Sequence, residues 1–455
     1  MRVAKGHLGP GELPPCRQLI TALGSSSTSP PSGYNKLSMA KPIVIVGAGL
    51  AGLVCARKLH RSGKEVIVLD SEDRPGGRMK TDLIDGFRLD RGFQTLFTAY
   101  PHAVQELDYS TLNLRKFERG ALVWDGDGLH KVSRDDPLEM AFSRFLRLSD
   151  KLKIFSYTNE VKSLSLDDIW HLEDISGEAA LRQFGFSEEF LDRFARPFFG
   201  GIFLDRSLSV SARMLAFVWK MLSEGDTAIP ALGIEQIPQQ IALDLPQASL
   251  KMGTRVESIL RENGAAVGVQ LVKGKKIDAE AIVVATDGST AARLTGESLK
   301  EDYRGSICLY FEAPVRPVFG GYIVLNGSGS GQVNHVAPMM NVAPELAPPG
   351  RGLVSVTILG ESPKDDGFLG REALYELGYW FPKRQVQDWR LLRVDRIRHA
   401  QLSMAPRRKR LAMESGASGL YVCGEATSHG SIDGAIESGL ACAACLVDSP
   451  ELVTA

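Results

Sequence analysis

A stretch near the beginning of the chain constrains the fold more than any other. Residues 42–78 read PIVIVGAGLAGLVCARKLHRSGKEVIVLDSEDRPGGR. The short apolar run Ile43–Val46 leads into the glycine-rich segment Gly47–Gly52, and an amphipathic segment follows to about Ser62. A second apolar run, Val66–Leu69, is followed by Asp70. Strand, glycine turn, helix, strand and acid in this order predict the βαβ unit that binds dinucleotides.

Each glycine of this turn has its own expected role. Gly47 permits the tight turn, Gly49 lets the backbone approach a pyrophosphate, and Gly52 lets the helix pack closely on the strand. The start of the helix then offers N–H groups and partial positive charge to the phosphates. Asp70 is placed to accept hydrogen bonds from an adenosine ribose, and the turn alone does not decide between FAD and NAD. The expected contacts of this unit are Gly47, Ala48, Gly49, Leu50, Ala51, Gly52, Asp70 and Ser71.

Length and composition narrow the class of protein. A chain of 455 residues is too long for one ordinary core, and two domains are expected. A net charge of −1 gives no indication of a nucleic-acid partner, and no run of apolar residues is long enough for a transmembrane helix. The six scattered cysteines suit a reducing compartment, and we interpret the Cys442–Cys445 CxxC pair as helix packing. The basic run Arg407–Arg410 is interpreted as a solvated loop.

The first 40 residues differ from the rest. They hold a single acid, Glu12, and a serine-rich segment at residues 24–32. An acid-poor, serine-rich and mildly basic segment is typical of an organelle transit peptide. We therefore expect a chloroplast or other plastid protein. The alternatives are a disordered tail, or a gene start at Met39 and a cytoplasmic protein.

Helical periodicity dominates from about residue 135 to 230, where few glycines or prolines interrupt it. We expect a mostly helical insertion with an apolar interior, placed as a roof over a cofactor. The apolar positions at helical spacing are Phe142, Phe145, Leu146, Leu152, Phe155, Phe190, Leu191, Phe194 and Phe198.

Strand patterns flank this insertion. Residues 122–132 form a predicted hairpin, and Ala281–Asp287 reads as a buried parallel strand that ends in a turn of small residues. Residues 302–325 and 351–360 alternate like antiparallel strands. The chain closes with a strand, a glycine turn and a helix over residues 419–446.

These patterns predict an α/β fold with a discontinuous Rossmann-like nucleotide domain and a second α+β domain. The first domain is assembled from residues 41–134, 232–300 and 400–450. The second, which would hold the substrate, is assembled from residues 135–231 and 302–399.

Three separated motifs together resemble one family. Asp70–Arg78 after the glycine turn resembles the double-glycine fingerprint of FAD oxidoreductases related to flavin amine oxidases, protoporphyrinogen oxidases and phytoene desaturases. Gly424–Gly439 resembles the second flavin motif of that family, and Ala281–Asp287 resembles its ATG-type strand. Arg196–Phe203 is similar to a segment of the desaturase-type branch. The resemblance spans about residues 41–448 and implies FAD, bound noncovalently, rather than NAD.

The resemblance also implies roles for individual residues. Arg78 would lie near the flavin diphosphate, the turn at residues 92–94 beside the flavin, and the backbone of Val256 at the adenine. Glu425 would bond the ribityl-phosphate portion, and the helix that begins at residues 432–435 would direct N–H groups at the flavin ring. The further contacts implied in this way are Gly77, Arg78, Gly92, Phe93, Gln94, Val256, Ala285, Thr286, Gly424, Glu425, Ile432, Asp433, Gly434 and Ala435.

The sequence departs from the amine oxidases at one position. Those enzymes typically carry a lysine near flavin N5 on a strand of the substrate domain, and Ser306 takes its place here. Hydride transfer between flavin N5 and an apolar substrate, in a desaturase, saturase or isomerase, is therefore favoured. A flavin amine oxidase and a noncatalytic flavoprotein scaffold are the alternatives.

No catalytic residue is identified, and neither a nucleophile triad nor a metal-ligand pattern is present in the sequence. His429, within the second flavin motif, is expected to be structural or to contact the flavin rather than to act as a general base. The expected partner is a small, apolar molecule. Peripheral contact with a membrane is compatible with such a substrate.

Overall fold

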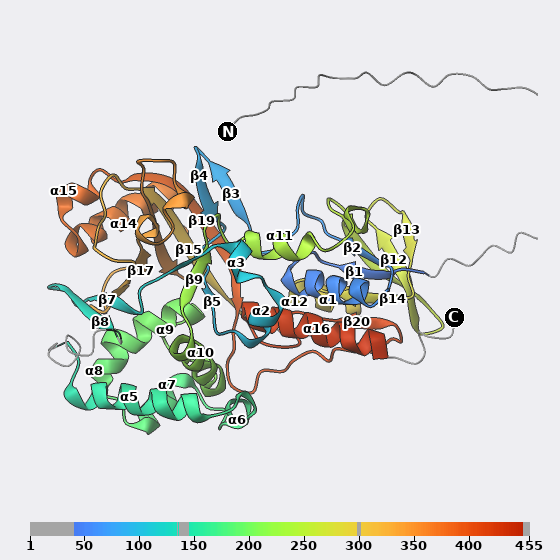
Figure 1. Ribbon diagram of the computed structural model, residues 1–455, viewed down its shortest axis with the longest axis horizontal. Coiled ribbons are helices and arrows are strands. Elements are labelled where there is room, and N and C mark those ends of the chain that lie inside the picture. Colours follow the sequence, from blue (N-terminus) through green and yellow to red (C-terminus); the bar gives the residue numbers. More distant parts are fainter. Residues whose placement is uncertain (1–40, 134, 136–144, 298–301, 449–455) are drawn as a thin grey trace, which may run out of the picture. The chain divides into compact units, whose positions relative to one another are not determined.

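A computed structural model describes residues 41–133, 135, 145–297 and 302–448 of the chain. The predicted transit peptide at residues 1–40 lies outside the described residues, as does Phe142 of the helical insertion. Ala40–Ala455 forms one compact unit with two main sheets (Figure 1).

The first main sheet is the parallel sheet that the glycine-turn pattern predicts. Its strand order is β10-β2-β1-β14-β20, and all neighbouring strands run parallel. In the central strand, Val46 pairs with Leu69 on one side and with Val284 on the other, and every residue of the strand is buried. The first two strands begin and end at the predicted residues. The strands are β1 (Ile43–Val46), β2 (Val66–Leu69), β10 (Leu250–Lys251), β14 (Ala281–Val284) and β20 (Leu420–Val422).

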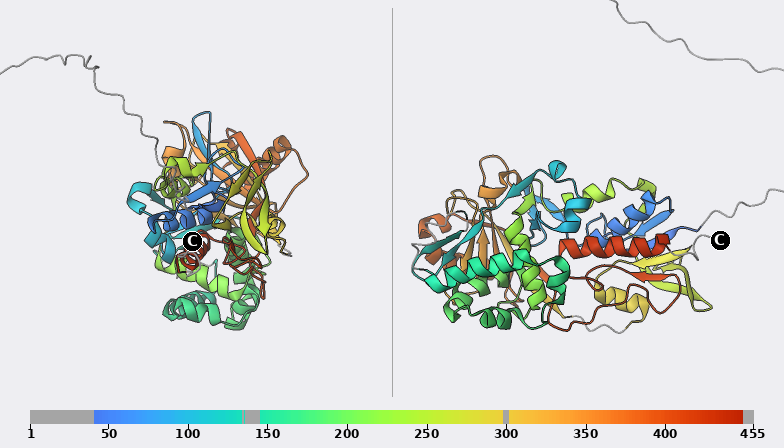
Figure 2. Two further views of the ribbon diagram at one scale, coloured as in Figure 1. Left: turned by 90° about the vertical axis from the view of Figure 1, so that its right-hand side faces the viewer. Right: turned by 60° about the horizontal axis from the view of Figure 1, so that its bottom comes forward.

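Two helices cover one face of this sheet. α1 (Leu50–Arg61) connects β1 to β2, and α16 (Ile432–Asp448) lies beside it (Figure 2). Small residues bring the two helices together, since a methyl group on Gly439 would lie 2.5 Å from the carbonyl oxygen of Ala51. Cys442 of the CxxC pair is buried at this level of α16, as helix packing predicts.

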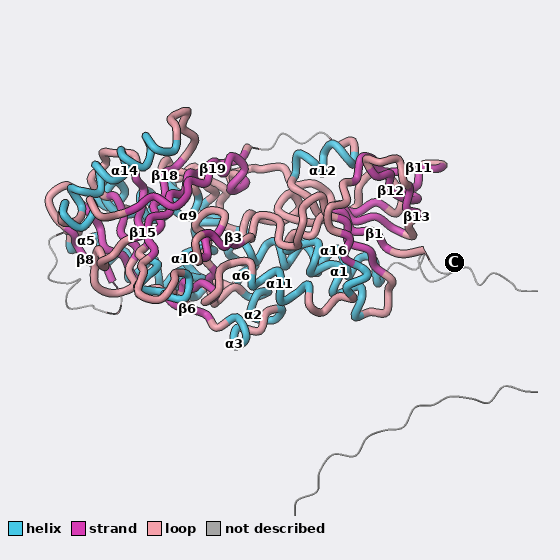
Figure 3. The backbone as a smooth tube through the Cα atoms, turned by 90° about the horizontal axis from the view of Figure 1, so that it is seen from above, coloured by secondary structure: helices cyan, strands magenta, loops and turns pink. Residues whose placement is uncertain are grey.

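The opposite face carries a small antiparallel sheet and one helix, which Figure 3 shows beside β1. Val46 and Val284 from the parallel sheet pack there with Val256 and Ala291. The parallel sheet therefore lies between two layers, as in a Rossmann-like domain. The elements of this layer are β11 (Val256–Glu262), β12 (Ala265–Leu271), β13 (Lys276–Asp278) and α12 (Gly288–Thr295).

The second main sheet has seven strands in the order β19-β15-β18-β17-β16-β7-β8. All neighbours are antiparallel except β16 and β7. The predicted hairpin is confirmed, and its two strands are β7 and β8. Both strands belong to this sheet, although residues 41–134 were predicted to be part of the nucleotide domain. The predicted domain boundaries stay a prediction. The strands are β7 (Gly120–Trp124), β8 (Leu129–Ser133), β15 (Tyr303–Glu312), β16 (Ile323–Asn326), β17 (Val333–Ala337), β18 (Leu353–Leu359) and β19 (Arg390–Leu402).

The two faces of the seven-stranded sheet differ in polarity. One face buries alternate residues of β15, such as Leu309 and Phe311, in a cluster with side chains of α14 (Asp366–Trp380). The residues between them, including Ser306 and Cys308, face the other side because side chains alternate along a strand. We call the set Ser306, Cys308, His335 and Thr357 the polar face; it lies on the side that α14 does not cover, where Tyr310 and Leu353 also pack in an apolar cluster. Two further short helices are α13 (Met339–Val342) and α15 (Lys383–Val386), and residues 344–346 form a 3₁₀ turn.

Residues 145–224 are mostly helical, as predicted. A π-helical turn over Leu191–Ala195 runs directly into α9, whose second residue, Pro197, has no backbone N–H to donate. The helices are α5 (Leu148–Ser163), α6 (Leu166–His171), α7 (Gly177–Phe184), α8 (Glu188–Phe190), α9 (Arg196–Phe203) and α10 (Ala212–Glu224).

Two residues assigned to the interior of this insertion are exposed. Leu152 and Phe155 of α5 have 63% and 68% of their surface accessible, so their predicted burial is wrong. The helix instead buries Tyr157 and Val161. Helical spacing shows which residues share a face, but not which face the rest of the chain covers.

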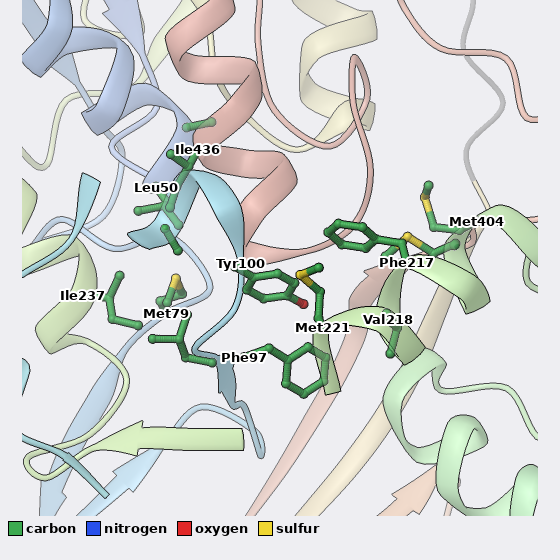
Figure 4. Packing of buried hydrophobic residues seen from close by; sticks show 14 of the residues in the cluster. Leu50, Met79, Phe97, Tyr100, Phe217, Val218, Met221, Ile237, Met404 and Ile436 are labelled. Atoms are coloured by element: carbon green, nitrogen blue, oxygen red, sulfur yellow. The ribbon is translucent and has the colours of Figure 1, made fainter. Parts of the chain in front are cut away.

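The interior of the insertion is built from stacked aromatic rings. Phe190, Phe194 and Phe198 follow one another with ring centroids 5.7 and 5.3 Å apart. Figure 4 shows where this core meets the helices of the parallel sheet, with Phe217 of α10 near Tyr100.

Short elements link the two main sheets. β3 and β4 form a hairpin, and β9 pairs with both β5 and β6. Their bounds are β3 (Thr81–Ile84), β4 (Phe87–Asp90), β5 (Leu96–Phe97), α2 (Pro101–Glu106), α3 (Tyr109–Leu112), β6 (Leu114–Lys116), β9 (Thr227–Pro230), α11 (Gln236–Ala242) and a 3₁₀ turn at Gln247–Ser249.

Candidate functional site

The turn between β1 and α1 contains two tightly packed glycines and an open one. A methyl group on Gly47 would lie 2.5 Å from the carbonyl oxygen of Ala285 and 3.2 Å from the nitrogen of Thr286. One on Gly52 would lie 2.1 Å from the carbonyl oxygen of Gly47, whereas no described atom lies within 4 Å of the same position on Gly49. The first turn of α1 holds no acidic residue. The open space at Gly49 therefore suits an anionic pyrophosphate at the helix N-terminus.

Asp70 connects the second strand to this turn. One carboxylate oxygen accepts a hydrogen bond from the nitrogen of Ala48 at 2.7 Å, and the other accepts one from the backbone two residues later at 2.8 Å. A carboxylate has about four acceptor positions, so ribose hydroxyls can still be bound. Ser71 is exposed beside it, whereas the side chains of Leu50 and Ala51 are buried.

The double-glycine turn lies against the first turn and leads to an ion pair with the end of the chain. A methyl group on Gly77 would lie 3.2 Å from the Cα of Gly49. The guanidinium of Arg78 lies 2.8 Å from a carboxylate oxygen of Glu425. Gln94 donates a hydrogen bond to the carbonyl oxygen of Arg78 at 3.0 Å. The structure thus brings together predicted cofactor residues from three distant segments.

Tyr303 completes this cluster and belongs to none of the motifs. Its hydroxyl donates to Glu425 at 2.9 Å and accepts from the backbone nitrogen of Gly288 at 3.2 Å, while its ring stacks on His399 with centroids 4.8 Å apart. Burial opposes the charge of Arg78, but the Glu425 carboxylate outweighs it and raises the arginine pKa. The ion pair therefore stays charged at neutral pH. No pattern in the sequence marks Tyr303, because only the fold places the first residue of β15 at this carboxylate.

The second flavin motif fixes the start of α16. The nitrogen of Gly424 donates to the hydroxyl of Ser438 at 2.9 Å, which ties the glycine turn to the helix. Ser431 caps the helix: its hydroxyl accepts from Gly434 at 3.0 Å and its carbonyl oxygen accepts from Ala435 at 3.0 Å. Two of the N–H groups predicted to face the flavin are thus already engaged in the cap.

Asp433 is oriented toward another helix. One of its oxygens accepts hydrogen bonds from the nitrogens of His102 and Ala103, at 2.8 and 3.2 Å, and the other lies 3.0 Å from Nδ1 of His102. Its side chain therefore caps α2. Any contact of this residue with a cofactor is left to its backbone and to that of Ile432, where α16 begins.

The turn at residues 92–94 contacts the seven-stranded sheet. Gly92 has a φ of +89°, and a methyl group there would lie 2.6 Å from the side chain of Ile397. Ile397 pairs with Ser306 across β19 and β15. The ring of Phe93 lies 5.3 Å from that of His335 on β17. Ser306, which the resemblance predicts to replace the lysine of amine oxidases, is therefore next to the strand that this predicted flavin turn touches.

His335 is a buried, neutral imidazole with one ring nitrogen left over. The amide nitrogen of Asn334 lies 3.1 Å from Nδ1 of His335 and also donates to the carbonyl oxygen of Pro197 at 3.1 Å. Nδ1 therefore accepts, and the proton is on Nε2. Burial lowers the pKa of His335 to about 4. Nε2 of His335 and the hydroxyl of Thr357, its cross-strand neighbour, make no hydrogen bond with the described part of the chain.

A family model described as "Flavin containing amine oxidoreductase" matches residues 50–447 of the chain. The protein belongs to this family. Its FAD cofactor, predicted from the three motifs, and its α/β fold, predicted from the strand and helix patterns, are confirmed at the level of the family. The family is one of oxidoreductases, so the predicted enzyme class is confirmed at the same level.

Individual relatives differ in what they are named for. A phytoene desaturase (neurosporene-forming) of Cereibacter sphaeroides is 27% identical over 287 residues, which is 55% of this chain and 54% of the relative. A mitochondrial protoporphyrinogen oxidase of Nicotiana tabacum is 27% identical over 178 residues, 38% of this chain and 34% of that protein. An oxidoreductase of Methanosarcina mazei superposes with a TM-score of 0.69 at 22% identity, over 88% of this chain and 99% of its own. The chain thus aligns with between a third and about half of these two curated relatives.

The residues present fit FAD. Gly49 provides open space at a helix N-terminus, Asp70 has acceptor capacity left, and the Arg78–Glu425 pair lies between the two glycine motifs. Among the described residues, no group of three or more His, Cys, Asp or Glu side chains could hold a metal ion. No described helix is long and apolar enough to cross a membrane. The individual cofactor contacts, the noncovalent attachment and the absence of a nucleic-acid partner stay predictions.

Proposed function

We propose that the protein is an FAD-dependent oxidoreductase that transfers hydride at a carbon atom of an apolar substrate, as a desaturase, saturase or isomerase does. When bound, FAD would exchange the hydride at N5. The observation that carries the proposal is the side chain at position 306. A serine there offers neither the charge nor the basicity of a lysine, which argues against amine oxidation.

The rest of the polar sheet face supports the same reading. β17 and β18 contain no lysine, arginine, aspartate or glutamate, and β15 contains Arg304 and Glu312 but no lysine. Instead, β15 presents Ser306 and Cys308 there, and the neighbouring strands present Thr357 and His335, which is neutral because burial lowers its pKa. Hydroxyl, thiol and imidazole groups can orient a substrate without drawing a proton from an ammonium group.

The desaturase-like segment lies against this face. On α9, a methyl group on Gly201 would lie 2.9 Å from the amide of Asn334 and 3.0 Å from Nδ1 of His335. The π-helical turn directly before α9 is a type of distortion that is frequent at functional sites. Phe198, on the same helix, is half-buried. These contacts place the desaturase-like segment directly against the polar sheet face, and the name of the desaturase relative supports an apolar substrate for this protein.

Anaerobic flavin reduction tests the proposal. The FAD-loaded protein is mixed with three classes of compound: an isoprenoid polyene such as phytoene, a porphyrinogen, and primary or polyamine substrates. We expect loss of the visible flavin absorbance with a polyene or porphyrinogen, and neither bleaching nor hydrogen peroxide release with amines. Bleaching by amines alone would establish the amine oxidase alternative. A flavin that no compound reduces, and whose dithionite-reduced form no compound reoxidises, would favour the noncatalytic scaffold.

Two lysine variants, one at position 306 and a matched control on a neighbouring strand, test whether position 306 decides the reaction class. Ser306→Lys introduces the amine at the position where amine oxidases carry it, and Ser355→Lys introduces the same charge on β18. We expect neither variant to bleach faster with polyenes than the native protein. Gain of amine-dependent bleaching in Ser306→Lys alone would show that position 306 decides the reaction class.

A further inference from the structure

A pocket separate from the predicted flavin contacts lies between the helical insertion and the C-terminal segments. Its volume is about 420 Å³, and of the residues considered as flavin contacts only His429 lines it. Pockets for small organic molecules commonly have roughly 300–1,000 Å³. The residues that line it are Trp170, Asp174, Ser211, Arg213, Met214, Met404, Ala405, Arg408, Arg410, His429 and Glu437.

Three arginines give this pocket its positive charge. Arg213 donates through Nε to the carbonyl oxygen of Leu172 at 2.7 Å, which fixes the plane of its guanidinium. Arg408 donates to the carbonyl oxygens of Glu425 at 3.1 Å and Ser428 at 2.6 Å. Neither Arg213 nor Arg410 forms an ion pair within 4.0 Å among the described residues. Carbonyl oxygens position Arg213 and Arg408, and the carbonyl oxygen that holds Arg213 does not neutralise its charge.

The two acids of the pocket are already engaged. Asp174 accepts hydrogen bonds from the hydroxyl of Ser211 at 2.6 Å and from the nitrogen of Arg407 at 2.7 Å. Glu437 accepts from the hydroxyl of Ser428. His429 contributes no charge, because burial lowers its pKa to about 4. Three cations thus face two anions, and α10 adds the positive end of its dipole because it begins directly after Ser211.

The remaining wall is apolar. The ring of Trp170 lies 5.3 Å from that of His429, and the side chains of Met214 and Met404 lie on the same pocket. Trp170 is half-buried, so part of its ring is available for contact. Aromatic and thioether groups of this kind suit the body of an organic molecule.

We propose that this pocket binds a small organic anion, in which a carboxylate is held by Arg213, Arg408 and Arg410 and an apolar body contacts Trp170 and the two methionines. Arginine matches a carboxylate through two parallel N–H donors, which makes it the preferred partner for this group. The proposal does not depend on the chemistry at the flavin, because the three arginines and Trp170 are not among the predicted flavin contacts. It adds a ligand site to the protein, distinct from the polar sheet face.

Calorimetric titration of the FAD-loaded full chain tests this proposal. The probes are benzoate, the neutral analogue benzamide, and inorganic phosphate. We expect saturable binding of benzoate, and binding of benzamide weaker by about tenfold or more, the size of effect that one charge-assisted hydrogen bond supports. No saturable benzoate binding would overturn the proposal. Phosphate binding as tight as benzoate would also overturn it, because the apolar wall would then contribute nothing.

Two variants and a matched control locate the binding. Arg410→Gln changes an exposed side chain and leaves the fold undisturbed, and Arg213→Gln removes a second charge. Each is expected to weaken benzoate by about tenfold while leaving benzamide unchanged. Arg407→Gln removes the same charge from an exposed residue of the same run that does not line the pocket, and is expected to bind benzoate normally. Equal losses in all three variants would mean that the net charge, and not the pocket, governs binding.

Discussion

Gly49 and Gly52 stand three residues apart, yet alanine at each should fail for a different reason. At Gly49 an added methyl group meets no described atom within 4 Å, and φ is −73°, which alanine adopts readily. At Gly52 the methyl group would lie 2.1 Å from the carbonyl oxygen of Gly47 and 3.0 Å from the Cβ of Ala285. The first substitution fills space meant for the cofactor, and the second fills space that the protein itself occupies.

The magnitudes follow from these distances. Overpacking a core typically costs about 1–3 kcal/mol, and Gly52→Ala should reach at least the upper end because a backbone oxygen must move. For Gly49→Ala, alanine is a poorer N-cap than glycine by up to about 1 kcal/mol, while a less flexible unfolded chain returns about 0.4–1 kcal/mol. These two effects nearly cancel, so the unfolding free energy of the apoprotein should change by less than about 1 kcal/mol.

Two measurements separate the variants. Urea unfolding of the apoproteins should show Gly52→Ala strongly destabilised and Gly49→Ala close to the native protein. Titration with FAD should show Gly49→Ala weakened by about 30-fold or more, since about 2 kcal/mol of pyrophosphate contact is lost. Unchanged FAD affinity in Gly49→Ala would refute the assignment of this space to the pyrophosphate. Unchanged stability in Gly52→Ala would refute the packing argument.

Four further outcomes are expected. Tyr303→Phe removes the hydroxyl that donates to Glu425 and should lower the unfolding free energy by about 1.5–3 kcal/mol in urea unfolding; Tyr375→Phe, an exposed control, should not. Burial raises the pKa of Asp90 to about 7, so the folded state binds this proton more tightly than the unfolded state. The contribution of Asp90 to the unfolding free energy is therefore present below about pH 4 and is lost as the pH rises to about 7, by at most about 1.4 kcal/mol per pH unit. Asp90→Asn should remove this dependence of the unfolding free energy on pH. His335→Asn keeps an acceptor for Asn334 but removes the Nε2 donor, and should lower kcat/KM for the true substrate by about tenfold or more, whereas His335→Gln should retain more activity. We also propose plastid import, for which isolated plastids should trim the full-length chain near residue 40; uptake failure would leave the cytoplasmic alternative.

The local sequence was sufficient to predict the structure wherever residues interact mainly with residues close to them in the sequence. β1 and β2 begin and end where the apolar runs do, and the β7–β8 hairpin forms around its predicted turn. The positive φ of Gly47 and Gly77 follows from turns that only glycine makes without strain. These features are fixed by backbone geometry over a few residues, so a pattern in the sequence can report them.

The contacts that position side chains across the site were not predictable in this way. Asp433 lies inside a flavin motif, yet its carboxylate caps α2, which is more than 300 residues earlier in the chain. Tyr303 has no motif and still binds Glu425. Phe155 has the right spacing for an interior residue and is exposed. In each case the missing information is which surface of an element another part of the chain covers.

The basic run Arg407–Arg410 shows that the surfaces covered in the fold also decide which residues can bind a ligand. Four consecutive basic residues suggested a solvated loop, and Arg407 and Lys409 are indeed exposed. Arg408 is an exception, because it donates to the carbonyl oxygens of Glu425 and Ser428 within the second flavin motif. Arg408 and Arg410, two residues apart, line the proposed anion pocket, while the residues that alternate with them do not. An anion in this pocket would bind the same guanidinium that donates to the carbonyl oxygen of Glu425, so the side chain of Arg408 connects the pocket to the flavin site. We therefore expect Arg408→Gln to weaken the binding of both benzoate and FAD, and Arg410→Gln to weaken the binding of benzoate alone.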